Sequence, residues 1–138
     1  MALFAALGPG PARAAATLDV YARQPAVQQM QLSPAGRRFA FVAVDGDRRR
    51  LFVRQIGGDA LAVLNLGEVK VWQIDWAGED IVLAYVSRAG GGREASEQSA
   101  AIVLNLATGK SYRVFEGRAD VQAQIAGYNG VRQTEAGW

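Results

Sequence analysis

Carboxylates gather in two short stretches of this chain where they could do chemistry. Asp75 stands close to Glu79 and Asp80, and paired carboxylates can act as general acid and base. Asp45-Gly46-Asp47 is half of a calcium loop, although the further acidic ligands and the closing glutamate are missing. Each stretch also contains or adjoins a glycine, so a plain turn is favoured at both.

Basic side chains form a second group of candidates. Arg48-Arg49-Arg50, together with Arg37 and Arg38, could form a patch that binds phosphates. The alternative, a solvated hairpin edge whose charges block stray strand pairing, is favoured. The net charge of +2 is too small to indicate a nucleic acid or an anionic membrane as partner.

Aromatic side chains are the third group. Trp72, Trp76 and Tyr85 suit contact with a peptide or a protein partner because their rings combine apolar area with a polar group. Burial in a core is the favoured alternative. These three residues are the only binding residues that we predict.

The composition argues against catalysis by this chain. It contains neither histidine nor cysteine, which removes the Ser-His-Asp triad, histidine-ligated metals and thiolate chemistry. The glycines at 90–92 lack the spacings that bind nucleotides. We therefore predict no catalytic, cofactor-binding or metal-binding residue.

A repeated phrase organises the chain. Ser33-Pro34-Ala35-Gly36 predicts a turn, and the aromatic and β-branched residues that follow predict a strand. The phrase returns around Gly78, so that Gly36 aligns with Gly78 and Phe41 with Leu83, 42 positions apart. A period of about 40–45 residues with four short strands is typical of a β-propeller blade. With 138 residues, half of them hydrophobic, the chain has the composition of a globular domain.

The expected fold is all-β: a partial β-propeller of about two four-stranded antiparallel blades, with the start of a third and a short helix before them. Ala12-Arg13-Ala14 fits a signal-peptidase site, which predicts a truncated signal peptide and a periplasmic or secreted protein. No apolar run is long enough to predict a transmembrane segment. The predicted segments are a signal peptide at 1–16, a helix at 17–26, blade one at 27–67, blade two at 68–117 and a truncated third blade at 118–138.

Within the second blade, Ile81–Ser87 and Ala101–Leu106 are expected as strands, joined by a flexible insertion at Arg88–Glu97. Val103 then corresponds to Val53, 50 positions earlier. The third blade is expected to begin with an inner strand at Val121–Ala126.

The phrase from Ser33 to Phe41 resembles the S-P-D-G-x-x-[IL]-A-[FY] repeat of TolB-like and prolyl oligopeptidase propellers. The segment from Leu18 to Val27 resembles the start of the mature chain in secreted bacterial serine peptidases of the prolyl oligopeptidase family, and Gly127-Tyr128-Asn129-Gly130 resembles their third blade. Ala35 and Ala77 stand where many such blades have aspartate, so the carboxylate that would bond the turn's amides is lost.

The resemblance implies that the propeller is non-catalytic and restricts the access of peptides to a C-terminal α/β-hydrolase domain. That domain and the peptide substrate are then the partners, and self-association of this piece through uncovered faces is expected. This chain lacks the G-x-S-x-G serine, so the activity would belong to the parent serine peptidase. An alternative is a periplasmic protein- or peptide-binding module that acts through partner binding or oligomerisation.

Overall fold

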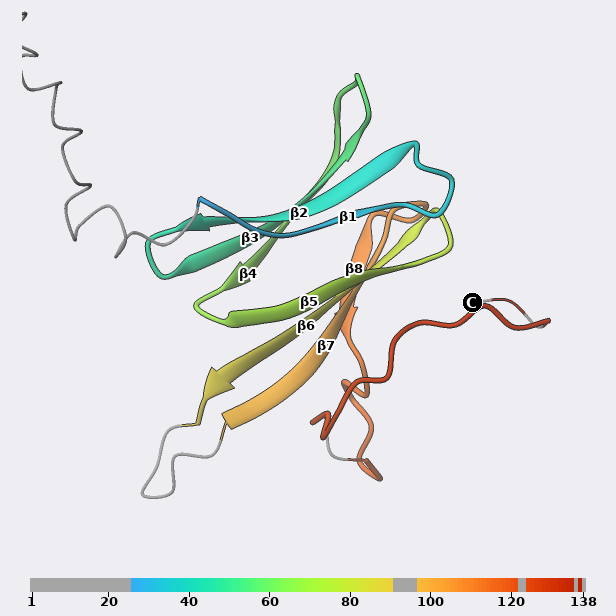
Figure 1. The fold of residues 1–138 in the computed structure, drawn as a ribbon. Coiled ribbons are helices and arrows are strands. Elements are labelled where there is room, and N and C mark those ends of the chain that lie inside the picture. The colour runs from blue at the N-terminus through green and yellow to red at the C-terminus, as the bar shows by residue number, and fades with distance from the viewer. Residues whose placement is uncertain (1–25, 91–96, 122–123, 136, 138) are drawn as a thin grey trace, which may run out of the picture.

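A computed structural model describes residues 26–90, 97–121, 124–135 and 137. In these residues it contains two four-stranded antiparallel sheets and no helix (Figure 1). The first sheet consists of β1 (Val27–Leu32), β2 (Arg38–Asp45), β3 (Arg48–Gln55) and β4 (Ala60–Gly67), in that order across the sheet. The second consists of β5 (Lys70–Ala77), β6 (Ile81–Ala89), β7 (Glu97–Asn105) and β8 (Lys110–Arg113), again in sequence order. The all-β prediction and the grouping into two sheets are confirmed.

Several features that the sequence predicts lie outside the described residues or are absent from them. The signal peptide and nearly all of the helix predicted at 17–26 lie outside the described residues, as does most of the glycine-rich insertion. No described residue belongs to a helix long and apolar enough to cross a membrane. The described sheets do not close into a ring.

The strands follow from alternation and tight turns. In β2, Ala40 and Val42 are fully buried while their neighbours are half-exposed, as expected for a strand with one face on a core. The turn predicted at Asp45–Asp47 is confirmed, because Asp45 pairs with Arg48 across the β2–β3 hairpin. Gly46 sits there with φ of 58°, a conformation in which a side chain would be strained.

The β6–β7 hairpin is longer than the sequence predicts. Strand β7 begins at Glu97 rather than at Ala101, and β6 continues to Ala89. A chain of hydrogen bonds holds this extension. The Trp72 indole N–H donates to the Ser87 hydroxyl (2.7 Å), which donates to the Glu97 carboxylate (2.6 Å).

The inner strand predicted at Val121–Ala126 is wrong for the described residues, which carry no strand after β8. A strand needs a neighbour to pair with, and the described residues after it offer only an isolated bridge between Thr134 and Gly137. The segment is nevertheless attached to the second sheet, since the Ile125 N–H bonds the Ser99 carbonyl (2.9 Å).

The hydrophobic core lies between the two sheets. Ala40, Val42, Leu51 and Val53 of the first sheet face the inner strand β5 and its neighbours. From the second sheet the core receives Ile74, Trp76, Val82, Ala84, Val86 and Leu104. Contacts between the sheets concentrate on β1 and β5, so the sheets meet at their first strands.

Each sheet is covered on one face by the chain that follows it. Strand β5 covers the face of the first sheet that carries Ala40 and Val53, a cross-strand pair. The segment after β8 covers the face of the second sheet that points away from the core. Leu83 and Val103 form a cross-strand pair on this covered face. Ala40 and Val53 thus lie on the face of the first sheet that the following chain covers, and Leu83 and Val103 lie on the corresponding face of the second sheet. Val53 and Val103, 50 positions apart, both lie on a face that the following chain covers, whereas Phe41 and Leu83, 42 positions apart, lie on faces with different neighbours.

A cluster of hydrogen bonds joins the first hairpin of each sheet. The Glu79 carboxylate accepts from the Ser33 hydroxyl (3.0 Å) and from the Ala35 backbone N–H (2.6 Å). The Arg38 guanidinium donates to the Glu79 carbonyl (2.6 Å) and pairs with the Asp80 carboxylate (2.7 Å). Glu79 thus supplies, from the next sheet, the carboxylate that Ala35 cannot provide to its own turn.

Two further bonds tie β1 to β5. Strand β1 has a bulge at Gln29, which takes a positive φ of 51°, and β5 has one at Trp72. The Gln29 side-chain amide donates to the Trp72 carbonyl (2.9 Å), so the two bulges are bonded to each other. The Trp76 indole donates to the Gln31 carbonyl (3.2 Å).

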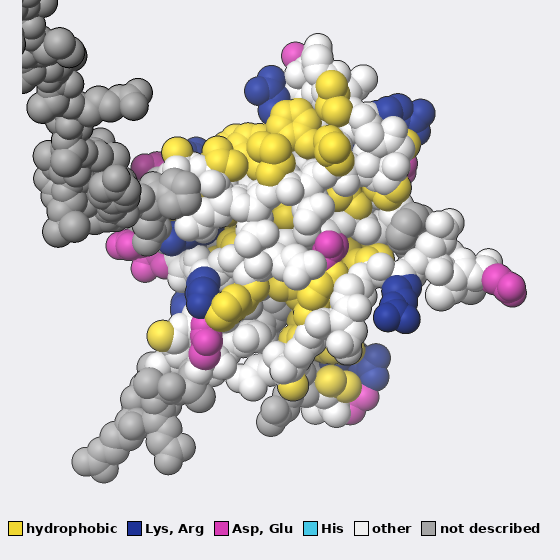
Figure 2. Space-filling model, in the orientation of Figure 1, with side chains coloured by type: hydrophobic (Ala, Val, Ile, Leu, Met, Phe, Trp, Pro, Cys, Tyr) yellow, Lys and Arg dark blue, Asp and Glu magenta, His cyan; other side chains and the backbone are white. Residues whose placement is uncertain are grey.

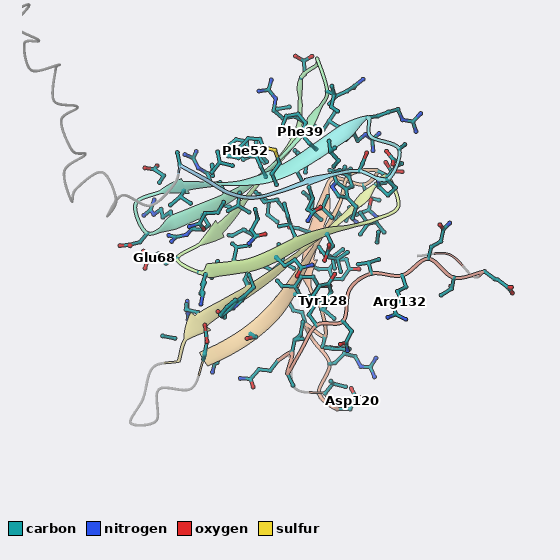
Figure 3. The ribbon with its side chains drawn as sticks, in the orientation of Figure 1. Phe39, Phe52, Glu68, Asp120, Tyr128 and Arg132 are labelled. Atoms are coloured by element: carbon teal, nitrogen blue, oxygen red, sulfur yellow. The ribbon has the colours of Figure 1, made fainter. Side chains whose placement is uncertain are left out.

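Replacing Glu79 tests this hairpin contact. We expect Glu79→Ala to lower the free energy of unfolding by about 1–3 kcal/mol, because the Ser33 hydroxyl and the Ala35 N–H both lose their acceptor. Glu79→Gln keeps one acceptor oxygen, so we expect a smaller loss. Urea denaturation measures both, with Glu68→Gln as the control because Glu68 is exposed and lies in the β4–β5 connection (Figure 3). Equal stability of Glu79→Ala and the unchanged chain would show that the contact contributes nothing.

Candidate polypeptide-binding surfaces

An aromatic cavity lies on the outer face of the second sheet, the face turned away from the first sheet. It has a volume of about 250 Å³ and is lined by Trp72 and Tyr85 together with residues 125–128 of the segment after β8. Trp72 and Tyr85, two of the three predicted binding residues, are therefore brought together. Their role as contacts for a peptide or partner stays a prediction.

Trp72 is held from two sides. Its indole N–H is bonded to Ser87, and the Lys70 ammonium lies 3.3 Å from the ring centroid. A cation over an indole face is attracted by the ring's electron density, which fixes the ring's orientation. The Trp72 residue remains 48% exposed, so a ligand can reach it.

Tyr85 and Tyr128 form the other wall. Their ring centroids lie 3.7 Å apart, and the Tyr128 hydroxyl donates to the Asp75 carboxylate, which also accepts from the Gln73 side-chain amide (2.9 Å). Burial raises the pKa of Tyr128 far above its ordinary range, and the bond to Asp75 adds to the increase because it favours the protonated phenol. Burial also raises the pKa of Tyr85.

Trp76 lies elsewhere. Its side chain is only 6% exposed and belongs to the core between the sheets, where it reaches β1 through the bond to Gln31. Trp72 and Trp76 are four positions apart and would share a face in a regular strand. The bulge at Trp72 shifts the alternation by one, which sends the two indoles to opposite faces.

A second apolar surface covers the outer face of the first sheet. We call it the phenylalanine face, and it consists of Met30, Leu32, Phe39, Phe41, Phe52 and Val63. Met30, Phe41, Phe52 and Val63 form one cross-strand row, with Leu32 and Phe39 paired beside it. The Phe41 ring stacks on Phe39 and Phe52 at centroid distances of 5.8 and 5.2 Å. Figure 2 shows hydrophobic side chains gathered over this sheet, and Figure 3 shows Phe39 and Phe52 on it.

This face is an unusual surface for a chain on its own. Met30, Leu32 and Val63 are each more than half exposed. Contiguous apolar faces of this kind are typical of protein–protein contacts, ligand-binding grooves and aggregation-prone surfaces. The sequence of β2 indicates this apolar face, because the strand carries apolar residues on both sides. Such a pattern is typical of a strand that is covered on both sides.

The charged candidates take structural positions. Asp75, Glu79 and Asp80 do not converge: the first binds Tyr128 and the others bind the first hairpin. Asp45 pairs with Arg50 (3.5 Å), whose guanidinium also lies 5.8 Å from the Phe52 ring centroid. Among the described residues, no group of three acidic side chains could hold a metal ion.

Comparison of the chain with protein-family models, with curated proteins and with solved structures found no match.

The bond between Tyr128 and Asp75 predicts a pH dependence. The folded pKa of Tyr128 lies above its unfolded value, so its stabilising contribution is complete below about pH 10 and declines as the unfolded state ionises at higher pH. We expect Asp75→Asn to move the ionisation of Tyr128 to lower pH in an absorbance titration of the phenolates. Tyr128→Phe identifies which titration step belongs to Tyr128. An unchanged titration in Asp75→Asn would contradict the contact.

Proposed function

We propose that this chain is a non-catalytic β-propeller segment whose phenylalanine face packs against another sheet of a larger ring. The observation that carries the proposal is the consistent direction of packing. The first sheet is covered on one face by the second, and the second is covered on the corresponding face by the segment after β8. Rotational repetition of blades around an axis requires this order. A repeat of this kind leaves the phenylalanine face for the unit that precedes the first sheet.

The same proposal extends to the parent protein. Following the resemblance of the phrase from Ser33 to Phe41, we propose a secreted or periplasmic serine peptidase of the prolyl oligopeptidase type, in which the propeller restricts peptide access to a hydrolase domain. The 138 residues of this chain supply none of the catalytic groups. The coding frame beyond residue 138 tests this attribution. It requires a G-x-S-x-G serine followed by aspartate and histidine.

Self-association of the 138-residue chain tests the role of the phenylalanine face. We expect the unchanged chain to form oligomers whose mass rises with concentration in light scattering, because several side chains of its apolar face are exposed among the described residues. The double substitution Met30→Gln with Val63→Thr should shift the mass toward that of the monomer, since both side chains project from this face.

Tyr112→Ser is the matched control, because Tyr112 is 56% exposed and lies on the second sheet. We expect it to leave the association unchanged. A monomer at all concentrations, or an equal effect of the control substitution, would remove the phenylalanine face from the proposal.

A second candidate function is peptide binding in the aromatic cavity, favoured by the convergence of Trp72, Tyr85 and Tyr128 around about 250 Å³. Aromatic walls suit extended peptides because flat rings contact both backbone and side chains. We expect a proline- and leucine-rich peptide to change the tryptophan fluorescence of the chain, and Trp72→Phe to abolish the change. Persistence of the full change in Trp72→Phe would assign it to another tryptophan and reject this site.

A further inference from the structure

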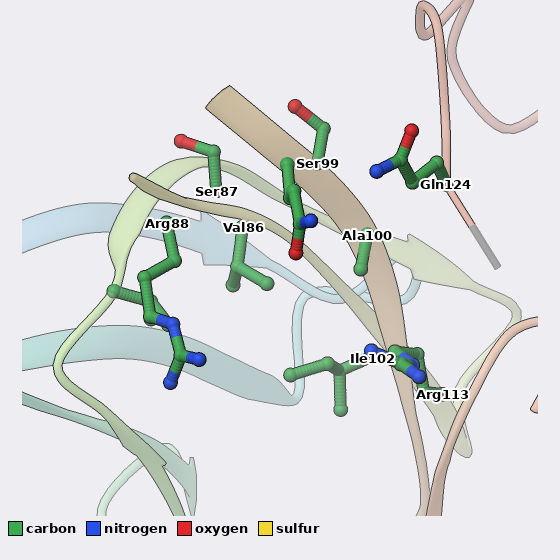
Figure 4. Close-up of a pocket in the computed structure, with 10 residues that line it drawn as sticks. Val86, Ser87, Arg88, Ser99, Ala100, Ile102, Arg113 and Gln124 are labelled. Atoms are coloured by element: carbon green, nitrogen blue, oxygen red, sulfur yellow. The ribbon is translucent and has the colours of Figure 1, made fainter. Parts of the chain in front are cut away.

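A larger cavity opens at the end of the second sheet nearest the β6–β7 loop (Figure 4). Its volume is about 510 Å³. It is lined by Val69, Val86, Ser87, Arg88, Gln98, Ser99, Ala100, Ile102, Arg113 and Gln124. Neither proposed function uses it.

Strand register places six of the ten lining residues on one face of the sheet. Arg88 pairs with Gln98, Val86 with Ala100, and Ile102 with Arg113. Cross-strand partners share a face, and every second residue returns to it. These side chains therefore continue the face that carries Val82 and Ala84 in the core, beyond the part that the first sheet covers. Val69, from the β4–β5 connection, adds an apolar residue from outside the sheet.

The cavity combines an apolar floor with two guanidinium groups. Val86, Ala100 and Ile102 are buried or half-buried, and Figure 4 shows Arg88 and Arg113 on either side of Ile102. Within the described part of the chain, neither guanidinium forms an ion pair. Glu116 lies close to Arg113, but its carboxylate accepts from the Arg113 backbone N–H. The cavity therefore has an excess of positive charge.

We infer that this cavity binds a carboxylate carried by a small aliphatic group, such as the C-terminal carboxylate of a peptide that ends in leucine or valine. The planar fork of a guanidinium matches a carboxylate and can bond both of its oxygens. An aliphatic group on the same molecule would replace water over Val86 and Ile102. Inorganic phosphate fits less well, since it is strongly hydrated and has no apolar part to place on this floor.

Arg88 and Arg113 belong neither to the phenylalanine face nor to the lining of the aromatic cavity. Arg88, Val86 and Ile102 lie on the face of the second sheet that looks toward the first sheet. The aromatic cavity lies on the other face, and the phenylalanine face belongs to the other sheet. The two cavities share Val86, Ser99 and Ala100, whereas Arg88, Ile102 and Arg113 line the larger cavity and not the aromatic one, so substitutions of these arginines report on the larger cavity.

The probe for the experiment is N-acetyl-leucine, titrated into the full 138-residue chain and followed by the amide signals of an NMR spectrum. We expect saturable shifts at Arg88, Ile102 and Arg113, which line this cavity and not the aromatic one. N-acetyl-leucine amide has the same shape without the charge, so we expect its affinity to be lower by about tenfold or more. We expect acetate to bind more weakly than N-acetyl-leucine because it lacks the isobutyl group.

Charge-removing variants complete the test. Arg113→Gln and Arg88→Gln should each weaken the binding of N-acetyl-leucine by about tenfold. Arg132→Gln is the control, because Arg132 is exposed and does not line the cavity. Arg113→Lys keeps the charge and serves if Arg113→Gln does not fold. Equal affinity for the acid and its amide would overturn the inference, as would tighter binding of inorganic phosphate or an equal loss in Arg132→Gln.

Discussion

The contact of the Glu79 carboxylate with the first turn is the interaction on which the arrangement of the two sheets depends. Two donors of that turn, the Ser33 hydroxyl and the Ala35 N–H, reach a carboxylate from the second sheet, and Arg38 returns two bonds to the same hairpin. A turn that carried its own aspartate would satisfy its amides locally. In this chain the donors of the first turn find their acceptor in the second sheet. The conformation of the first hairpin and the packing of the two sheets therefore depend on the same hydrogen bonds.

Local pattern was enough to predict most of the strands but not their relation to one another. Alternation in β2 and the turns at Gly46 and Gly78 indicate strands without reference to the rest of the chain. The match of Phe41 with Leu83 rests on the glycines, and an equal distance from a turn glycine does not fix which face of its sheet a side chain takes. Which face that is depends on loop lengths and on bulges, which residue types do not reveal.

The aromatic cavity shows the same limit. Trp72 and Tyr85 could be chosen from sequence because aromatic rings suit contact with a peptide, but the separation of Trp72 from Trp76 required the bulge to be known. Tyr128 stands out in the sequence only as part of a segment that resembles a third blade. Its contact with Asp75 spans 53 positions and leaves no local signal. The same holds for Arg88 and Arg113, which are brought to one cavity by three strands.

The sequence distance across the first turn's contact has a consequence for synthesis on the ribosome. The Glu79 carboxylate lies 44 positions after Ala35 and 46 after Ser33. Ser33 and Ala35 are therefore synthesised before their acceptor. Completion of the first turn's hydrogen bonds thus depends on the second sheet following it out of the ribosome.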